Sequence, residues 1–396
     1  MSLSVRPRPY IIPEYSLTGD LLAYLSCGLQ YRYYSKGSLP PSTPVQLWFG
    51  EFIHSVMEEA YSRWRQGGQN QRFPWNWNPD MRDIELEIDR RLRVSGLYPT
   101  PRLFCPYTSS TYTQGLCPDT NHPHRLIASK RTEAAINTWG PHLFPLVHEA
   151  EVRLEGIRGM PNYAPGRSRS NYYGITGVAD VISSVRLQNS APGNLILRYV
   201  RNNASLQRII DNLPSDEYEI IIDYKGMRRP PVNSPLWRYQ EWQILTYAWL
   251  RSQQPQSNPV VAGILFYLNE LELSTVDMVD LKDEVASTLT DVMPQGADLR
   301  NIIAWNQGSP LPQMSGPFRE ERSIRTIPCD SGTIYNALQQ FDVVVGNIES
   351  CVLTETVGGG ITPSWQPNPN RRNCTACDFK TFCPNPAPGP YHPTVP

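Results

Sequence analysis

The residues best suited to chemistry are Asp223 and Lys225, which follow the apolar run at 220–222. Residues two apart in a strand face the same side, so these two side chains are predicted to converge. A carboxylate can hold a divalent cation, and a lysine beside it can position a water molecule. Taken alone, such a short motif is also typical of an ordinary ion pair at the end of a strand.

A second carboxylate, Asp180, ends the segment Gly177-Val178-Ala179-Asp180. On an antiparallel neighbour of the 217–225 strand, it could lie beside Asp223. Two such carboxylates raise each other's pKa unless a cation lies between them. The alternative is a turn or capping aspartate. Glu149 and Glu151 are two apart, so we expect them to share a face of the preceding strand, as outer acids of a site or as part of a solvated surface.

One histidine could complete a metal site. His54 lies in the segment 45–64. Apolar residues recur there at helical spacing and form one stripe, so the segment is predicted to be a helix. His54 is off that stripe, and Gly50 precedes it by one turn, where a glycine would allow close approach of another element. Alone, His54 could equally be a packed or surface histidine.

A further polar pair lies on a second predicted helix, at 236–251. Gln243 and Tyr247 are four residues apart and therefore share a helix face. They could form a simple polar patch, although the flanking residues are apolar.

The eight cysteines are unevenly distributed, because three of them, Cys374, Cys377 and Cys383, fall within ten residues of a polar segment. Such tight spacing is more typical of metal ligation than of core thiols. A second, looser group could bind zinc and comprises Cys105, Cys117, His122 and His124. Because the spacing of these residues is long and irregular, the sequence favours the alternative that they bind no metal.

Composition restricts the partners of the protein. The 36 Lys and Arg residues against 37 Asp and Glu residues give a net charge of −1, which excludes a uniformly basic nucleic-acid coat. Any polyanion must meet a local basic patch, such as Arg228, Arg229 and Arg238 near the Asp223 motif. No apolar run is long enough to span a membrane and no signal peptide is recognisable, so a cytoplasmic protein is expected.

The order of predicted elements favours an α/β fold with a central mixed sheet. Strands are expected near 148–159, 174–185, 217–225 and 260–269, with 271–279 as a further candidate strand and 187–216 as a polar connection. The expected parts are an N-terminal segment 1–44, a core of 45–65 and 141–290, a helical insertion 66–140, and a C-terminal helical region 291–396 with the clustered cysteines.

These motifs, in this order, resemble the RecB-type branch of the PD-(D/E)XK nuclease superfamily. The resemblance implies a restriction-endonuclease-like core in which His54, Asp180 and Asp223 bind Mg²⁺ or Mn²⁺. It implies that Lys225 serves the attacking water, and that Gln243 and Tyr247 abut the active site and the DNA. The third motif has Asp where many members have Glu, a variation that the superfamily name includes.

The clustered cysteines, together with the distant Cys27, resemble the iron–sulfur site of a subset of these nucleases, the AddB-type recombination nucleases and the CRISPR-adaptation nuclease. The resemblance implies a [4Fe-4S] cluster on Cys27, Cys374, Cys377 and Cys383 that joins the two chain ends. Four thiolates also suit structural zinc.

We therefore expect a metal-dependent DNA nuclease, an exonuclease acting on single-stranded or frayed ends in repair, recombination or CRISPR adaptation. The sequence has no P-loop motif, so unwinding would come from a helicase or from CRISPR-adaptation partners. The alternatives are a catalytically silent DNA-binding subunit and a zinc-stapled structural protein. Tyr31, Tyr33 and Tyr34 could stack unpaired bases or simply pack.

Overall fold

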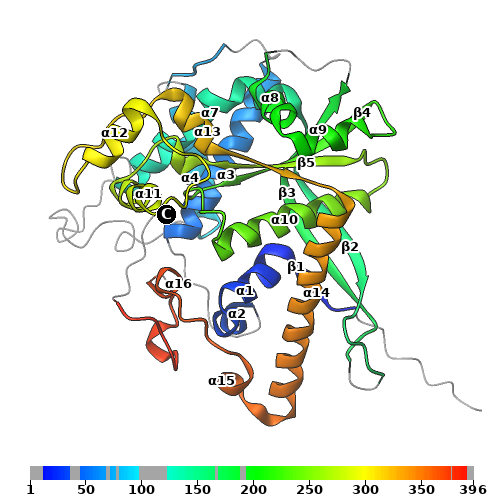
Figure 1. Cartoon of the computed structure of the whole chain (residues 1–396). Helices are drawn as coiled ribbons and strands as arrows, with labels where there is room; N and C mark the ends of the chain where they lie inside the picture. Colours follow the sequence, from blue (N-terminus) through cyan, green and yellow to red (C-terminus); the bar gives the residue numbers. More distant parts are fainter. Residues whose placement is uncertain are drawn as a thin grey trace, which may run out of the picture.

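The fold is known from a computed structural model, which describes residues 12–35, 45–67, 72–76, 80–97, 123–165, 168–187, 193–375 and 377–389. Within these ranges the chain forms one mixed sheet with helices on both faces (Figure 1). This arrangement confirms the expected α/β fold with a central mixed sheet.

Six strands form this sheet, and the long β-branched runs of the sequence supply its central members. Their bounds are β1 (Glu14–Ser16), β2 (Val147–Gly159), β3 (Tyr172–Arg186), β4 (Glu217–Lys225), β5 (Val260–Tyr267) and β6 (Ile324–Pro328). The order is β1-β3-β4-β5-β6, with β2 on the other edge of β3. The β1–β3 and β4–β5 pairs are parallel, whereas the other pairs are antiparallel.

One edge of β3 is shared by two strands, and a gap separates them. β4 pairs with β3 up to Ile222, which lies opposite Val181, and β1 pairs with β3 up to Ser16, which lies opposite Thr176. Residues 177–180 of β3 therefore lie between the ends of the two partner strands. Asp180 is in this gap, directly beside the point where β4 leaves β3.

Helices rich in apolar residues cover one face of the sheet. They are α3 (Val45–Gln66), α4 (Arg82–Val94), α7 (Pro123–Leu143), α8 (Leu195–Asn202) and α9 (Ala204–Asp211). All five contribute to one hydrophobic core with β4 and β5. The described helices of the segment 66–140 are part of this layer, since the rings of Trp139 on α7 and Phe266 on β5 lie 4.8 Å apart.

The opposite face is covered by α10 (Pro235–Ser252) and the long α14 (Ser331–Thr354), which pack on each other over the sheet (Figure 1). The N-terminal elements complete this layer. They are a π-helical turn η1 (Leu17–Leu22) and the helices α1 (Ala23–Ser26) and α2 (Gly28–Ser35). Burial of the apolar side chains between these elements holds the second core together.

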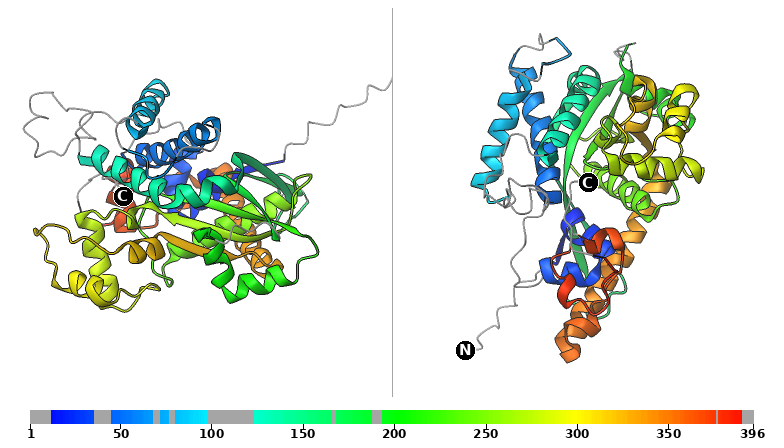
Figure 2. Two further views of the ribbon diagram at one scale, coloured as in Figure 1. Left: turned by 90° about the horizontal axis from the view of Figure 1, so that it is seen from above. Right: turned by 90° about the vertical axis from the view of Figure 1, so that its left-hand side faces the viewer.

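The C-terminal part of the chain adds a small helical unit and then returns to the N-terminus. The unit comprises α11 (Thr275–Ala286), α12 (Gly296–Ala304) and α13 (Gly316–Ser323), with a hydrophobic core of its own. The segment after α14 holds α15 (Ile361–Ser364) and α16 (Arg371–Thr375), and it lies beside α1 and α2, as the right-hand view of Figure 2 shows. The N-terminal helices and the C-terminal segment are thus neighbours.

Two expectations about local structure are wrong. The segment 271–279 is not a strand, because Ser274 and Asp277 form a capping box that starts α11. The segment 187–216 is not an open connection, since Asn194 and Asn203 each cap a short helix, α8 and α9. In addition, no described helix has the length and hydropathy needed to cross a membrane.

Candidate active site

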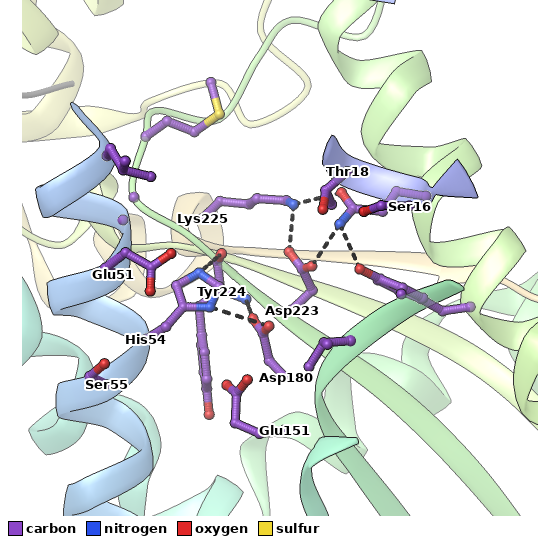
Figure 3. A pocket seen from close by; sticks show the side chains of 18 of the residues that line it. Ser16, Thr18, Glu51, His54, Ser55, Glu151, Asp180, Asp223, Tyr224 and Lys225 are labelled. Atoms are coloured by element: carbon purple, nitrogen blue, oxygen red, sulfur yellow. Dashed lines mark hydrogen bonds and ion pairs between the residues drawn. The ribbon is translucent and has the colours of Figure 1, made fainter. Parts of the chain in front are cut away.

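A cleft of about 950 Å³ opens at the gap in the edge of β3. The helix α3 borders it on one side, and β1 and η1 border it on the other (Figure 3). The ends of β3 and β4 form its floor. The cleft therefore gathers side chains from segments that are far apart in the sequence.

Asp223 and Lys225 are adjacent on the floor of this cleft, at the end of β4. The Lys225 Nζ lies 2.6 Å from Oδ2 of Asp223, which is 2% exposed. Lys225 also donates a hydrogen bond of 2.8 Å to Oε1 of Gln243 on α10. The structure thus brings these three predicted site residues together, with the lysine held between a carboxylate and an amide oxygen.

The peptide unit around Tyr224 fixes both Asp180 and His54. The Tyr224 N–H donates to Oδ2 of Asp180 at 2.7 Å, and the Tyr224 carbonyl lies 3.1 Å from Nε2 of His54. A carbonyl only accepts, so Nε2 carries a proton. The other ring nitrogen, Nδ1, faces Oδ1 of Asp180 at 3.2 Å. This geometry leaves His54 Nδ1 and Asp180 Oδ1 as the atoms that can bind a metal.

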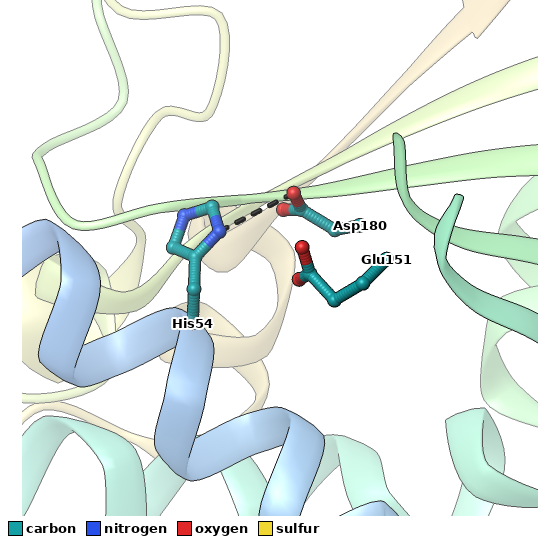
Figure 4. A group of neighbouring side chains, drawn as sticks. All are labelled: His54, Glu151 and Asp180. Atoms are coloured by element: carbon teal, nitrogen blue, oxygen red, sulfur yellow. Dashed lines mark ion pairs between the residues drawn. The ribbon is translucent and has the colours of Figure 1, made fainter. Parts of the chain in front are cut away.

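The third member of the metal group is Glu151, which the sequence predicted either as an outer acid of the site or as part of a solvated strand face; it is exposed and also lines the cleft. His54, Glu151 and Asp180 each offer a ligand atom, and these atoms lie within 4.8 Å of one another (Figure 4). Glu151 lies between Ala150 and Val152, which pair with Val181 and Ala179 on either side of Asp180, and it has a φ of 52°. A left-handed conformation of a glutamate is strained, and such strain is concentrated at functional sites.

The two glutamates do not share a role, although they are two residues apart. Glu149 forms an ion pair of 2.8 Å with Arg251 of α10, beside the buried pair of Arg251 and Glu219. The simple alternation rule failed here because the backbone at Glu151 leaves regular strand geometry, with a φ of 52°. No sequence signal marks this conformation.

The pKa values of the site residues are shifted because several carboxylates lie close together in the cleft. Burial lowers the pKa of His54, but the adjacent Asp180 and the charge of Asp223 outweigh it and raise the pKa to about 9. Burial and the charge of Asp180 raise the pKa of Glu151 to about 7. Burial also raises the pKa of Asp223, although Lys225 opposes this shift. A cation in the cleft would relieve this repulsion between carboxylates.

Gln243 and Tyr247 are buried parts of the wall on α10. The Gln243 Nε2 donates to Oδ1 of Asp223 and to the hydroxyl of Tyr247, each at 3.2 Å. Tyr247 packs on Gly177, where a Cβ would lie 2.6 Å from its ring. Close approach thus requires a glycine at 177. The same expectation for Gly50 is wrong, since a Cβ there would meet nothing within 4 Å.

The predicted cysteine ligands line a second, smaller cavity between the chain ends. Cys27 lies after α1, and Cys374, Cys377 and Cys383 come from the C-terminal segment. These four residues are called the cysteine set below. Burial raises the pKa of Cys377 to about 11, and the nearby Cys27 and Cys374 add to this effect. A bound metal ion would reverse that shift.

The tyrosines of α2 pack, and none of them is placed to stack bases. Tyr31 is 1% exposed and donates to Asp20, whereas the rings of Tyr33 and Tyr34 contact Phe379 near the cysteine set. The N-terminal helices are therefore attached to the C-terminal segment by aromatic contacts as well.

Two of the three arginines expected to bind phosphate near Asp223 form internal ion pairs, whereas Arg238 is exposed. Arg228 forms an ion pair of 2.8 Å with Glu284, and Arg229 pairs with Asp291 at 2.5 Å. They stabilise the contact between the sheet and the small helical unit. Of the looser zinc group, Cys105, Cys117 and His122, as well as the side chain of His124, lie outside the described residues.

In the comparison with known proteins, one family model matches part of the chain. Residues 200–384, somewhat less than half of the chain, match the family model of the PD-(D/E)XK nuclease superfamily. This range includes Asp223, Lys225, Gln243 and Tyr247, and it indicates a nuclease, hence a phosphodiester hydrolase.

The other comparisons add little. No curated protein matches the chain. A solved structure titled "Crystal structure of SSO0001" is 14% identical, with a TM-score of 0.23 over 84% of this chain and 98% of that chain. A TM-score this low does not establish a common fold.

Proposed function

We propose that the protein is a metal-dependent DNA nuclease that cleaves single-stranded or frayed ends as an exonuclease. The observation that carries this proposal is the cluster of His54, Glu151 and Asp180 beside the Asp223–Lys225 pair, within one cleft. The match to the PD-(D/E)XK nuclease superfamily supports it independently.

His54 Nδ1, Asp180 Oδ1 and a carboxylate oxygen of Glu151 would hold Mg²⁺ or Mn²⁺, with Asp223 next to them. The donor set fits, because these cations prefer carboxylate oxygens and Mn²⁺ also accepts imidazole. Such a cation polarises a phosphate and lowers the pKa of bound water. The ion pair between His54 and Asp180 shows that the two groups already face one another, so little rearrangement is needed.

Lys225 is the residue that we assign to the attacking water. Its ammonium group has three protons, of which Asp223 and Gln243 accept two. The third can donate to a water or to the charge that develops on the phosphate. Gln243 and Tyr247 fix the position of the Lys225 side chain, since both belong to the same chain of hydrogen bonds as Asp223.

We further propose that the cysteine set holds a [4Fe-4S] cluster. The four cysteines line one small cavity between the chain ends. Four thiolates are the usual ligands of such a cluster. The division of the set into one N-terminal and three C-terminal cysteines resembles that of the iron–sulfur nucleases, and this resemblance favours the cluster over structural zinc.

A role in DNA repair, recombination or CRISPR adaptation, with a helicase or adaptation proteins as partners, is part of the same proposal. It rests on the resemblance of the motifs to RecB-type nucleases with an iron–sulfur site.

The test is cleavage of end-labelled single- and double-stranded DNA in Mn²⁺ or Mg²⁺, with a chelator as the blank. Asp223→Asn and Lys225→Ala should lose at least a hundredfold in rate, since each removes a group at the reacting phosphate. Asp283→Asn and Lys130→Ala, which change exposed residues of the same types, should keep wild-type rates. A pure wild-type protein that binds DNA without cutting it would instead identify a silent DNA-binding subunit.

A further inference from the structure

The two sides of the cleft differ in charge. One side, here called the acidic wall, consists of Glu51, Ser55 and Glu58 on α3. The opposite side, here called the polar wall, consists of Ser16, Thr18, Thr176 and Asn373. Figure 3 shows Glu51 and Ser55 on the helix and Ser16 and Thr18 across the cleft from them.

This asymmetry determines where a phosphate backbone can run. Glu51 and Glu58 are exposed and add to the negative charge around Glu151, so they repel phosphates on their side. The polar wall carries hydroxyl and amide groups without charge. Such groups commonly donate hydrogen bonds to phosphate oxygens and position a strand without reading its sequence.

Asn373 of the polar wall lies next to the cysteine set. It directly precedes Cys374, and its Nδ2 donates at 3.3 Å to the carbonyl of Ser26, the residue before Cys27. The amide has a second proton, which this bond does not use. The position of Asn373 in the cleft thus depends on the contact between the two chain ends that carry the cysteines.

We propose that a single nucleic-acid strand crosses the cleft along the polar wall, and that Asn373 is a substrate-binding residue that donates to its phosphate. This inference rests on the proposed nuclease function and adds the path of the substrate. It also gives the cysteine set a role at the cleft, because that set holds one of the phosphate-binding groups in place.

Asn368 provides a matched control. Its Nδ2 donates at 3.1 Å to the same Ser26 carbonyl, but the residue lines the cysteine cavity and not the cleft. Asn368→Ala and Asn373→Ala therefore remove similar contacts between the chain ends. Only Asn373→Ala also removes a side chain that lines the cleft.

The experiment measures binding of a fluorescent single-stranded oligonucleotide in Ca²⁺ by anisotropy, together with the visible absorbance of each preparation. Asn373→Ala should weaken binding by roughly tenfold, as expected for a lost hydrogen bond to a charged group. It should raise KM more than it lowers kcat and leave the absorbance unchanged. Asn368→Ala should bind as the wild type does. Thr18→Val, a change of an exposed residue of η1, should weaken binding in the same way.

Each other outcome overturns the inference. If Asn373→Ala and Thr18→Val bind normally while the wild type cleaves DNA, the strand follows another path and the nuclease function stands. If Asn373→Ala binds weakly only because its visible absorbance is lost, Asn373 acts on the cysteine set and not on the phosphate. If the wild type neither binds nor cleaves, the proposed function fails, and the inference fails with it.

Discussion

Binding of Mn²⁺ to the cleft should become much tighter as the pH rises. The pKa of His54 is raised to about 9, so its Nδ1 carries a proton at neutral pH and faces Asp180 as part of an ion pair. A metal can take this position only when that proton leaves. Glu151, with a pKa of about 7, adds a second proton that is released over a lower range.

The size of the effect follows from these two values. At pH 7 binding should release about one proton from His54 and about half a proton from Glu151. Between pH 6 and pH 8, His54 alone should tighten binding by about a hundredfold. Glu151 should add up to about tenfold more, reduced because solvent screens the charges around this exposed carboxylate.

Calorimetric titration with Mn²⁺ in buffers of different ionisation enthalpy measures both the affinity and the number of protons released. His54→Ala should bind Mn²⁺ more weakly and lose most of the pH dependence, and His54→Ala with Glu151→Gln should lose the remainder. The control is His148→Ala, because His148 is an exposed histidine that pairs with Glu149 outside the metal group.

A wild-type affinity that is the same at pH 6 and pH 8 would refute this reasoning. So would a proton release that persists in the double variant. Either result would mean that the metal binds to other atoms than His54 Nδ1 and Glu151.

Two further predictions concern the supports of the site. Gly177→Ala should place a Cβ 2.6 Å from the Tyr247 ring, cost about 1–3 kcal/mol of folding free energy and slow cleavage, whereas Gly50→Ala, with open space around it, should do neither. Chemical denaturation and initial rates check this, and equal stability of the two variants would contradict it. Cys377→Ser should lose the visible absorbance and melt at a lower temperature, whereas the buried Cys329→Ala should keep its absorbance. A Cys377→Ser protein that retains full iron would exclude the cysteine set as the ligand.

The elements that could be predicted were those with strong periodicity. The apolar stripe of the segment 45–64 and the β-branched runs at 217–225 and 260–269 correspond to α3, β4 and β5 within one or two residues. The segment 271–279 was assigned as a strand because short apolar runs do not distinguish strand from helix. There the capping pair of Ser274 and Asp277 decided the structure.

Sequence periodicity likewise predicted only part of the candidate site. Asp223 and Lys225 converge through the period of two of a strand, which is a local rule. Glu151 could not be found in this way, because its direction depends on its left-handed backbone conformation. The use of Arg228 and Arg229 in ion pairs could not be predicted either, since their partners lie 56 and 62 residues further along the chain.

The central claim is that metal held by His54, Glu151 and Asp180 supports cleavage of DNA. It is tested most directly by measuring the Mn²⁺ dependence of cleavage and the calorimetric Mn²⁺ affinity on the same preparations of wild type and Glu151→Gln. The Mn²⁺ concentration for half-maximal cleavage should equal the dissociation constant in the wild type, and both should rise by the same factor in the variant. If Glu151→Gln weakens Mn²⁺ binding while the Mn²⁺ dependence of cleavage stays the same, the cleft does not carry the activity.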